Sequence, residues 1–207
     1  MNTFPTVHIV DDDEAIRSSL RLLIKISGMN PKTYSSAEDL LNNADLTQHC
    51  CLIVDIRMPG MSGLELQHHL NKKQYKIPLI IITGHGDISL AVEAMKSGAY
   101  DFFEKPVDDD RLIIRVKESL DSYAKLTNQK KQIEDANGLI SKLTGREKEI
   151  MDLLVQGKPN KSIAAELNIS VRTVEAHRGN IMHKMQTQSL SDIVRIALTG
   201  QHQVYSG

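Results

Sequence analysis

The sequence predicts a doubly wound α/β domain with a five-stranded parallel sheet, followed by a small all-α helix-turn-helix domain. Two observations predict the first domain: five short apolar segments alternate with amphipathic helical segments, and the connections between them are short. A third observation predicts the second domain: near residue 160, a short helical segment, a tight turn and a longer helical segment follow one another. The length of 207 residues suggests one or two domains.

The apolar segments mark the strands. Leu52-Ile53-Val54 is a continuous apolar run, which is typical of a strand buried on both faces of a parallel sheet. We expect the strands at residues 7–10, 32–34, 52–54, 78–83 and 100–103, with 32–34 as the weakest.

Apolar residues at helical spacing mark the segments between the strands. Ser36 is a candidate N-cap, and an amphipathic helix spans Gly63 to about Lys73. The last helix of the first domain begins near Asp109 and continues as a linker, and we expect Asn137-Gly138 to break it.

Polar residues stand at the carboxyl ends of four expected strands. Asp11 and Asp12 follow the first strand, Asp55 ends the third, Thr83 ends the fourth and Lys105 follows the fifth. Because these ends lie at one edge of a parallel sheet, a single pocket should collect three carboxylates, a hydroxyl and an ammonium group.

Three ionised carboxylates in one pocket repel one another, so the pocket needs a cation, and Mg²⁺ suits such oxygen ligands. The pocket can then receive a phosphoryl group, with Asp55 as the attacking carboxylate and Thr83 and Lys105 holding the phosphoryl oxygens. A strand-end aspartate also commonly caps a turn or a helix, and for Asp55 taken alone the two interpretations have equal weight. No Gly-x-Gly-x-x-Gly follows the first strand, which argues against a dinucleotide site.

Composition adds bounds on the class of protein. Hydrophobic residues make up 41% of the chain and charged residues 25%, as in a globular protein. The net charge is −1, but residues 141–207 hold nine Lys and Arg against six Asp and Glu, a net +3, whereas residues 1–140 carry −4. The basic C-terminal part allows a nucleic-acid contact without proving one.

The two cysteines are adjacent, Cys50 and Cys51, so in a strand they point to opposite faces and form neither a disulfide nor a metal site. We expect both to be buried thiols. The start of the chain shows no signal peptide, and the apolar runs are far below the ~20 residues that cross a bilayer. These features predict a protein of the reducing cytoplasm with no membrane partner.

The C-terminal part shows four helical segments. Thr144 and Glu147 have the spacing of a capping box at the start of the first. The others are expected at residues 159–167, at 171 to about 185, and at 190–198.

The longest of these helices sorts into two faces. Val174, Ile181 and Met185 share one stripe and should point to the core. The small and polar residues of the other face suit entry into a DNA major groove, although an ordinary solvated face is an almost equally supported alternative. Candidate phosphate contacts are Lys161, Arg172, Arg178 and Lys184. The remaining candidate DNA contacts are Thr173, Glu175, Ala176 and Asn180.

Four motifs together resemble the receiver domain of two-component response regulators, over about residues 4–122. They are the early Asp-Asp, Val-Asp-Ile-Arg-Met-Pro-Gly-Met-Ser-Gly, Ile-Thr-Gly-His-Gly and Phe-Phe-Glu-Lys-Pro. The resemblance implies that Asp55 is the phosphoacceptor and that Thr83 and Lys105 bind the phosphoryl group. It also implies that Mg²⁺ is held by Asp11, Asp12, Asp55 and the backbone carbonyl of Arg57.

Phe102 stands three residues before Lys105, where the family has the aromatic residue that changes rotamer on phosphorylation. For Phe102 alone, plain packing in the core is an equally supported interpretation.

Leu-Thr-Gly-Arg-Glu-Lys-Glu-Ile and Val-Arg-Thr-Val-Glu-Ala-His-Arg in the C-terminal part look like a LuxR-type DNA-binding domain, and the combination is similar to regulators of the FixJ type. We therefore expect a receiver domain at residues 4–122, a helical linker at 123–140 and a DNA-binding domain at 141–207. The implied partners are a cognate histidine kinase, double-stranded promoter DNA and RNA polymerase. The implied homodimer forms on phosphorylation through a face that would include Ala91, Val92, Met95 and Tyr100.

Two other functions compete with a phosphorylation-switched transcription factor. One is a DNA-binding regulator that works without phosphorylation and uses the receiver only to dimerise. The other is a phosphatase or phosphotransferase with an aspartyl-phosphate intermediate. Such an enzyme needs a second acid two residues after the nucleophile, where this chain has Arg57, so we expect its turnover to be poor and the chain not to act as an enzyme.

Overall fold

The computed structural model describes residues 4–47, 49–84 and 88–201. The chain consists of two compact units, and the boundary between them in the sequence lies between Leu126 and Thr127. In the first unit, five strands form one all-parallel sheet in the order β2-β1-β3-β4-β5. The strands are β1 (Thr6–Val10), β2 (Asn30–Tyr34), β3 (Cys50–Asp55), β4 (Leu79–Thr83) and β5 (Asp101–Glu104). The predicted doubly wound fold is confirmed, with strand ends shifted by one or two residues.

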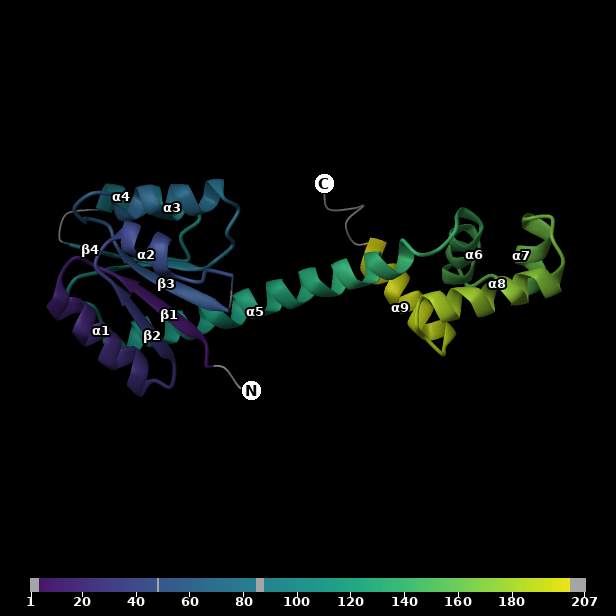
Figure 1. Ribbon diagram of the computed structural model, residues 1–207, viewed down its shortest axis with the longest axis horizontal. Coiled ribbons are helices and arrows are strands. Elements are labelled where there is room, and N and C mark those ends of the chain that lie inside the picture. Colours follow the sequence, from purple (N-terminus) through teal and green to yellow (C-terminus); the bar gives the residue numbers. More distant parts are fainter. Residues whose placement is uncertain (1–3, 48, 85–87, 202–207) are drawn as a thin grey trace. The chain divides into compact units, whose positions relative to one another are not determined.

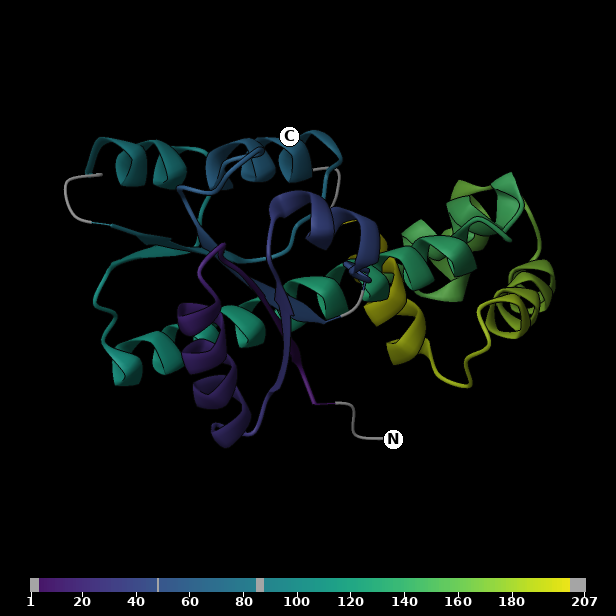
Figure 2. The ribbon, with the colours of Figure 1, turned by 60° about the vertical axis from the view of Figure 1, so that its left-hand side comes forward.

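Helices cover both faces of this sheet (Figures 1 and 2). One face carries α1 and α5, and the other carries α2, α3 and α4. Their bounds are α1 (Glu14–Ile26), α2 (Ala37–Asn43), α3 (Gly63–Lys72), α4 (Ile88–Lys96) and α5 (Asp109–Ile140).

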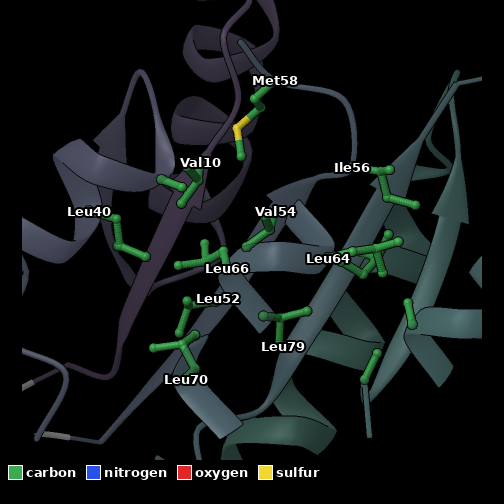
Figure 3. Close-up of a cluster of buried hydrophobic side chains, with 14 of the residues drawn as sticks. Val10, Leu40, Leu52, Val54, Ile56, Met58, Leu64, Leu66, Leu70 and Leu79 are labelled. Carbon is green, nitrogen blue, oxygen red and sulfur yellow. The ribbon is translucent and has the colours of Figure 1, made fainter. Parts of the chain in front are cut away.

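Every residue of β3 is buried, because this strand lies in the middle of the sheet with helices on both sides. Leu52 and Val54 pack into the cluster beneath α2 and α3, which Figure 3 shows, whereas Cys51 and Ile53 pack toward α1 and α5. The adjacent thiols are both free and buried, as expected. Cys51 Sγ accepts a hydrogen bond from the Ser119 hydroxyl of α5 at 3.2 Å.

The strand register sets the position of the acidic residues. Val10 of β1 pairs with Val54 of β3, so Asp11 and Asp55 follow at the same level on neighbouring strands. Asp55 pairs with Ile82, which places Thr83 one residue further along the next strand. The carboxyl edge of the sheet therefore gathers these side chains, as the sequence predicts.

In the described part of the second unit, up to residue 201, four helices follow the end of α5, and their apolar side chains form one core. Val174, Ile181 and Met185 are buried in that core, which confirms their predicted face. The helices are α6 (Gly145–Val155), α7 (Asn160–Glu166), α8 (Val171–Lys184) and α9 (Leu190–Gln201). A short α7, a turn and a longer α8 form the predicted helix-turn-helix.

The expected break at Asn137-Gly138 is wrong, because α5 continues through both residues to Ile140. A glycine inside a helix costs only about 1 kcal/mol relative to alanine, and packing easily offsets that amount. Here Ala136 is buried, and Gly200 of α9 lies so close that a Cβ on it would come within 2.7 Å of the Ile140 side chain. Residues 127–140 accordingly belong to the helical unit.

Within the described ranges, no helix combines the length and apolar character that crossing a bilayer requires.

Candidate functional site

Asp11 directly follows β1 and is 2% exposed, whereas Asp12 beside it is exposed. Asp11 Oδ1 accepts a hydrogen bond from the Asp13 backbone N–H at 2.8 Å. Arg17 of α1 donates to the backbone carbonyl of Asp11 at 2.7 Å. Asp13 itself caps α1 by accepting from the Ala15 N–H. The turn into α1 thereby holds the Asp11 carboxylate at the edge of the sheet, and Asp13 takes the ordinary capping role.

Lys105 joins two of the acids. Its Nζ lies 2.9 Å from Asp11 Oδ2 and 3.1 Å from Asp55 Oδ1. Its backbone N–H donates to the Thr83 carbonyl at 2.8 Å, which continues the ladder beyond β5 and fixes the start of the Lys105 side chain. The structure thus brings together a lysine and two carboxylates that are 94 and 50 residues away from it in the sequence.

Lys105 alone does not balance the negative charge of Asp11 and Asp55. Burial raises the pKa of the Asp55 carboxyl, and the hydrogen bond and charge of Lys105 act against that rise without cancelling it. Burial lowers the pKa of Lys105, but its bonds to Asp11 and Asp55 together outweigh burial and raise it. A single ammonium group therefore does not offset the burial of the Asp55 charge.

Asp11, Asp12 and Asp55 each offer a carboxylate oxygen, and these oxygens lie within 4.8 Å of one another. A hard divalent cation with oxygen ligands, such as Mg²⁺, fits this group, because it would supply the missing charge and keep water on its open side.

Thr83 ends β4 and is buried, and its hydroxyl donates weakly to the Gly84 carbonyl at 3.4 Å. Residues 85–87 lie outside the described residues, and they include part of the Ile-Thr-Gly-His-Gly motif. Phe102 is 42% exposed on β5, whereas its neighbour Phe103 is buried. The alternative that Phe102 packs in the core is therefore wrong, because alternation along the strand turns Phe103 inward instead.

The loop between β3 and α3 carries Arg57, which is exposed. Ser62 and Glu65 close the end of this loop as a capping box. Sequence analysis missed one residue that holds it: Glu38 of α2 accepts a hydrogen bond from the Met61 N–H at 3.0 Å. Residues 38 and 61 lie 23 positions apart, so no local pattern could have revealed the contact.

The residues predicted for a dimer face differ in their exposure. Val92 and Met95 are exposed large apolar residues, and Tyr100 is half-buried. Ala91 of α4 is 1% exposed, so the prediction that it lies on that face is wrong: its side chain is buried.

Most of the predicted DNA-contact residues lie at the surface of α7 and α8. Arg172, Glu175, Ala176 and Asn180 are exposed on α8, as is Lys161 on α7. Thr173 is half-buried, and its hydroxyl lies 2.7 Å from that of the N-cap Ser170.

Two of the predicted basic contacts have partners inside the unit. Arg178 donates to Asn160 Oδ1 at 2.6 Å and so ties α8 to the start of α7. Lys184 Nζ lies 2.6 Å from the buried Glu147 carboxylate of α6. Lys184 lowers the pKa of Glu147, helped by the Thr144 backbone N–H.

Comparison with known proteins decides the family. Residues 7–117 match the family described as response regulator receiver domain, and residues 141–197 match bacterial regulatory proteins, luxR family. This chain is a two-component response regulator. It joins a receiver to a LuxR-type DNA-binding domain, and it is a transcriptional regulator.

Full-length relatives share this domain combination. The transcriptional regulatory protein FixJ of Rhizobium meliloti (strain 1021) is 44% identical, and the match covers 94% of this chain and 96% of the relative. The response regulator StyR, whose structure is solved at low resolution, is 40% identical in sequence, and its structure matches this one with a TM-score of 0.85. The match covers 94% of this chain and 98% of the StyR chain. Full-length FixJ from B. japonicum is 38% identical with a TM-score of 0.60, covering 97% and 99%.

Proposed function

We propose that this response regulator accepts a phosphoryl group on Asp55 from a histidine kinase and that this transfer controls promoter binding by α8. The observation that supports the proposal best is the convergence of Lys105 with Asp11 and Asp55 at the carboxyl edge of the sheet. A buried carboxylate that touches a lysine and lies beside two further acids is poorly explained as a turn cap.

In the proposed transfer, a carboxylate oxygen of Asp55 forms a bond to phosphorus as the bond between phosphorus and the kinase histidine nitrogen breaks. The imidazole leaves with the electron pair of that bond. Bound Mg²⁺ would neutralise charge on the phosphoryl oxygens, held by Asp11, Asp12, Asp55 and the backbone carbonyl of Arg57. Lys105 would pair with the new phosphoryl oxygens in place of its present partner on Asp55, and the Thr83 hydroxyl would donate to them.

The charge added to Asp55 would shift a pre-existing equilibrium between two receiver conformations. Movement of Thr83 toward the phosphoryl group would let Phe102 leave its exposed position on β5. The rearranged surface of α4 and β5, with Val92, Met95 and Tyr100, would then pair two copies of the chain. A dimer would present two α8 helices to half-sites about 34 Å apart on one face of DNA.

On DNA, α8 would enter the major groove with Thr173, Glu175, Ala176 and Asn180 near the base edges. Lys161 and Arg172, which are exposed, would contact phosphates. Arg178 and Lys184 would contribute too, Lys184 less so because Glu147 offsets its charge. RNA polymerase would be the protein partner at the promoter. Because the target is chromosomal DNA, we expect the protein to act in the cytoplasm.

In this function the chain is a switch that does not turn over substrate. The position two residues after Asp55, where an enzyme of this chemistry needs a second acid, holds the cation Arg57. We therefore expect hydrolysis of the aspartyl-phosphate to be slow enough for the signal to persist.

Capture of genomic DNA fragments by the purified full-length chain tests this function. Wild type and Asp55→Asn are each compared with and without acetyl phosphate and Mg²⁺. We expect a distinct set of fragments to be enriched only for wild type with the phosphodonor. The same enrichment without phosphodonor, or with Asp55→Asn, would support the phosphorylation-independent alternative instead.

A further inference from the structure

The carboxylate of Glu38 is fixed at the start of α2 and reaches a loop from another part of the fold. Its pKa lies below the usual range because the carboxylate accepts hydrogen bonds from its own backbone N–H, from the Met61 N–H and from the Ser36 side chain. Glu38 Oε1 is 3.0 Å from the Met61 nitrogen. The same oxygen would be 3.0 Å from a Cβ on Gly60, whose φ is +78°. Glu38 thus touches two consecutive residues of the loop between β3 and α3.

That loop is also held at its two ends. The Gly63 N–H donates to the Ile56 carbonyl at 2.9 Å, which closes the loop at its base. At the same end, the Gly63 Cα packs directly against the Asp55 carbonyl oxygen. In the middle of the loop, Glu38 supplies a hydrogen-bond acceptor from outside the loop. Arg57, whose carbonyl is the proposed Mg²⁺ ligand, lies between the closed base and the point held by Glu38.

We infer that Glu38 is a positioning residue, which holds the β3–α3 loop so that the Arg57 carbonyl is ready to bind Mg²⁺ beside Asp55. The inference rests on the proposed function, because it takes the Arg57 carbonyl as a metal ligand. Glu38 acts through Met61 and Gly60, and it would not itself be a ligand of the metal or of the phosphoryl group. Its effect is to lower the cost of ordering the loop when the ion binds.

A simpler role for Glu38 is to stabilise the first turn of α2, as acidic residues commonly do. Asp39 offers the matched comparison, since it lies in the same turn and carries the same charge. Its carboxylate accepts from the Ser35 N–H at 3.2 Å and from the Asn43 side chain at 2.8 Å, and so stays within α2 and its N-terminal turn. Loss of Asp39 should weaken the helix turn without releasing the loop.

The test is the dissociation constant for Mg²⁺, measured by isothermal titration calorimetry on the full-length chain without any phosphodonor. Glu38→Ala removes the acceptor, Glu38→Gln keeps an acceptor oxygen but loses the charge, and Asp39→Asn loses the same charge from the same turn. We expect Glu38→Ala to raise the dissociation constant roughly tenfold, the lower end of the effect of outer-shell partners of a metal site. Glu38→Gln and Asp39→Asn should both stay within about twofold of wild type, because neither frees the loop.

Two further measurements keep the test decisive. Amide hydrogen exchange at Met61 should accelerate in Glu38→Ala and stay slow in Asp39→Asn. If Glu38→Ala does not fold, Glu38→Asp keeps the charge but withdraws the carboxylate by one methylene, and it should weaken Mg²⁺ binding in the same way. A Glu38→Ala or Glu38→Asp protein that binds Mg²⁺ as tightly as wild type overturns the inference. Absence of Mg²⁺ binding by wild type would instead overturn the proposed function itself.

Discussion

A Cβ on Gly63 would lie 2.3 Å from the backbone carbonyl oxygen of Asp55. The first residue of α3 therefore packs against the backbone at the end of β3 with no room for a side chain. Gly63→Ala must move either α3 or the strand end, and overpacking of this kind costs about 3 kcal/mol. We expect that loss in the free energy of unfolding of the first unit by urea, followed by tyrosine fluorescence, since four of the five tyrosines precede residue 127.

The matched control is Gly138→Ala, the same chemical change where nothing lies within 4 Å of the added Cβ. Gly138 is exposed in the interior of α5, so alanine should stabilise the helical unit by about 0.5–1 kcal/mol. A Gly63→Ala protein as stable as wild type would mean that the packing of α3 on Asp55 is looser than described.

The basic residues of the helical unit should separate into two kinds. Lys184→Met removes the cation beside the buried Glu147 carboxylate. Because Lys184 is one-third exposed, water screens part of the loss, and we expect the unit to lose about 1–2 kcal/mol in urea denaturation. Lys161→Met and Arg172→Met replace exposed cations and should leave stability within about 0.5 kcal/mol.

The same three variants should rank in the reverse order when the salt dependence of DNA binding is measured. Loss of a phosphate contact lowers the slope of log affinity against log salt by about 1, so Lys161→Met and Arg172→Met should each do so. Lys184→Met should change the slope less, provided that binding is measured well below the melting temperature of this variant. An equal reduction by Lys184→Met would show that Glu147 does not hold this lysine when DNA is present.

His8 of β1 should make the first unit sensitive to acid. The residue is 1% exposed, its Nδ1 lies 3.0 Å from the Tyr34 hydroxyl, and its Nε2 has no hydrogen-bond partner among the residues that the structure describes. Burial, helped by the positive charge of Lys32, lowers the pKa of His8 from 6.5 to about 4. Between these two pKa values the unfolded chain binds a proton on His8 that the folded chain excludes. The free energy of unfolding therefore falls as pH falls from 6.5 toward 4.

The full loss from this histidine is ~3 kcal/mol, and unfolding by urea at a series of pH values measures it. His8→Phe removes the titrating ring and should flatten this part of the pH profile. His68→Gln, which changes an exposed histidine of α3, should keep it. A wild-type profile that matches that of His8→Phe would show that His8 is solvated or protonated in the folded chain.

The fold and the convergence of Asp11, Asp55 and Lys105 were predictable because both depend on local patterns. Apolar runs give the strands, and the geometry of a parallel sheet brings the polar residues at the ends of these runs to one edge. Asp11, Asp55 and Lys105 meet for this reason, although they are far apart in the sequence. Similarly, the stripe of Val174, Ile181 and Met185 depends only on helical spacing.

What the sequence did not reveal depends on contacts between distant segments. Neither the bond from Met61 to Glu38 nor the pairing of Lys184 with Glu147 leaves a local signal. The adjacent residues Phe102 and Phe103 look alike in the sequence, and only the sheet decides that Phe103 is buried. The helix through Gly138 persists because packing of Ala136 and Gly200 outweighs a weak local preference.

The most direct test of the account is to locate the phosphoryl group. The full-length chain is incubated with acetyl phosphate and Mg²⁺, reduced with borohydride, which converts an aspartyl-phosphate to homoserine, and mapped by peptide mass spectrometry. We predict homoserine at position 55 in wild type and at no position in Asp55→Asn. Homoserine at Asp11 or Asp12 in wild type, or a phosphoryl group retained by Asp55→Asn, would contradict the account.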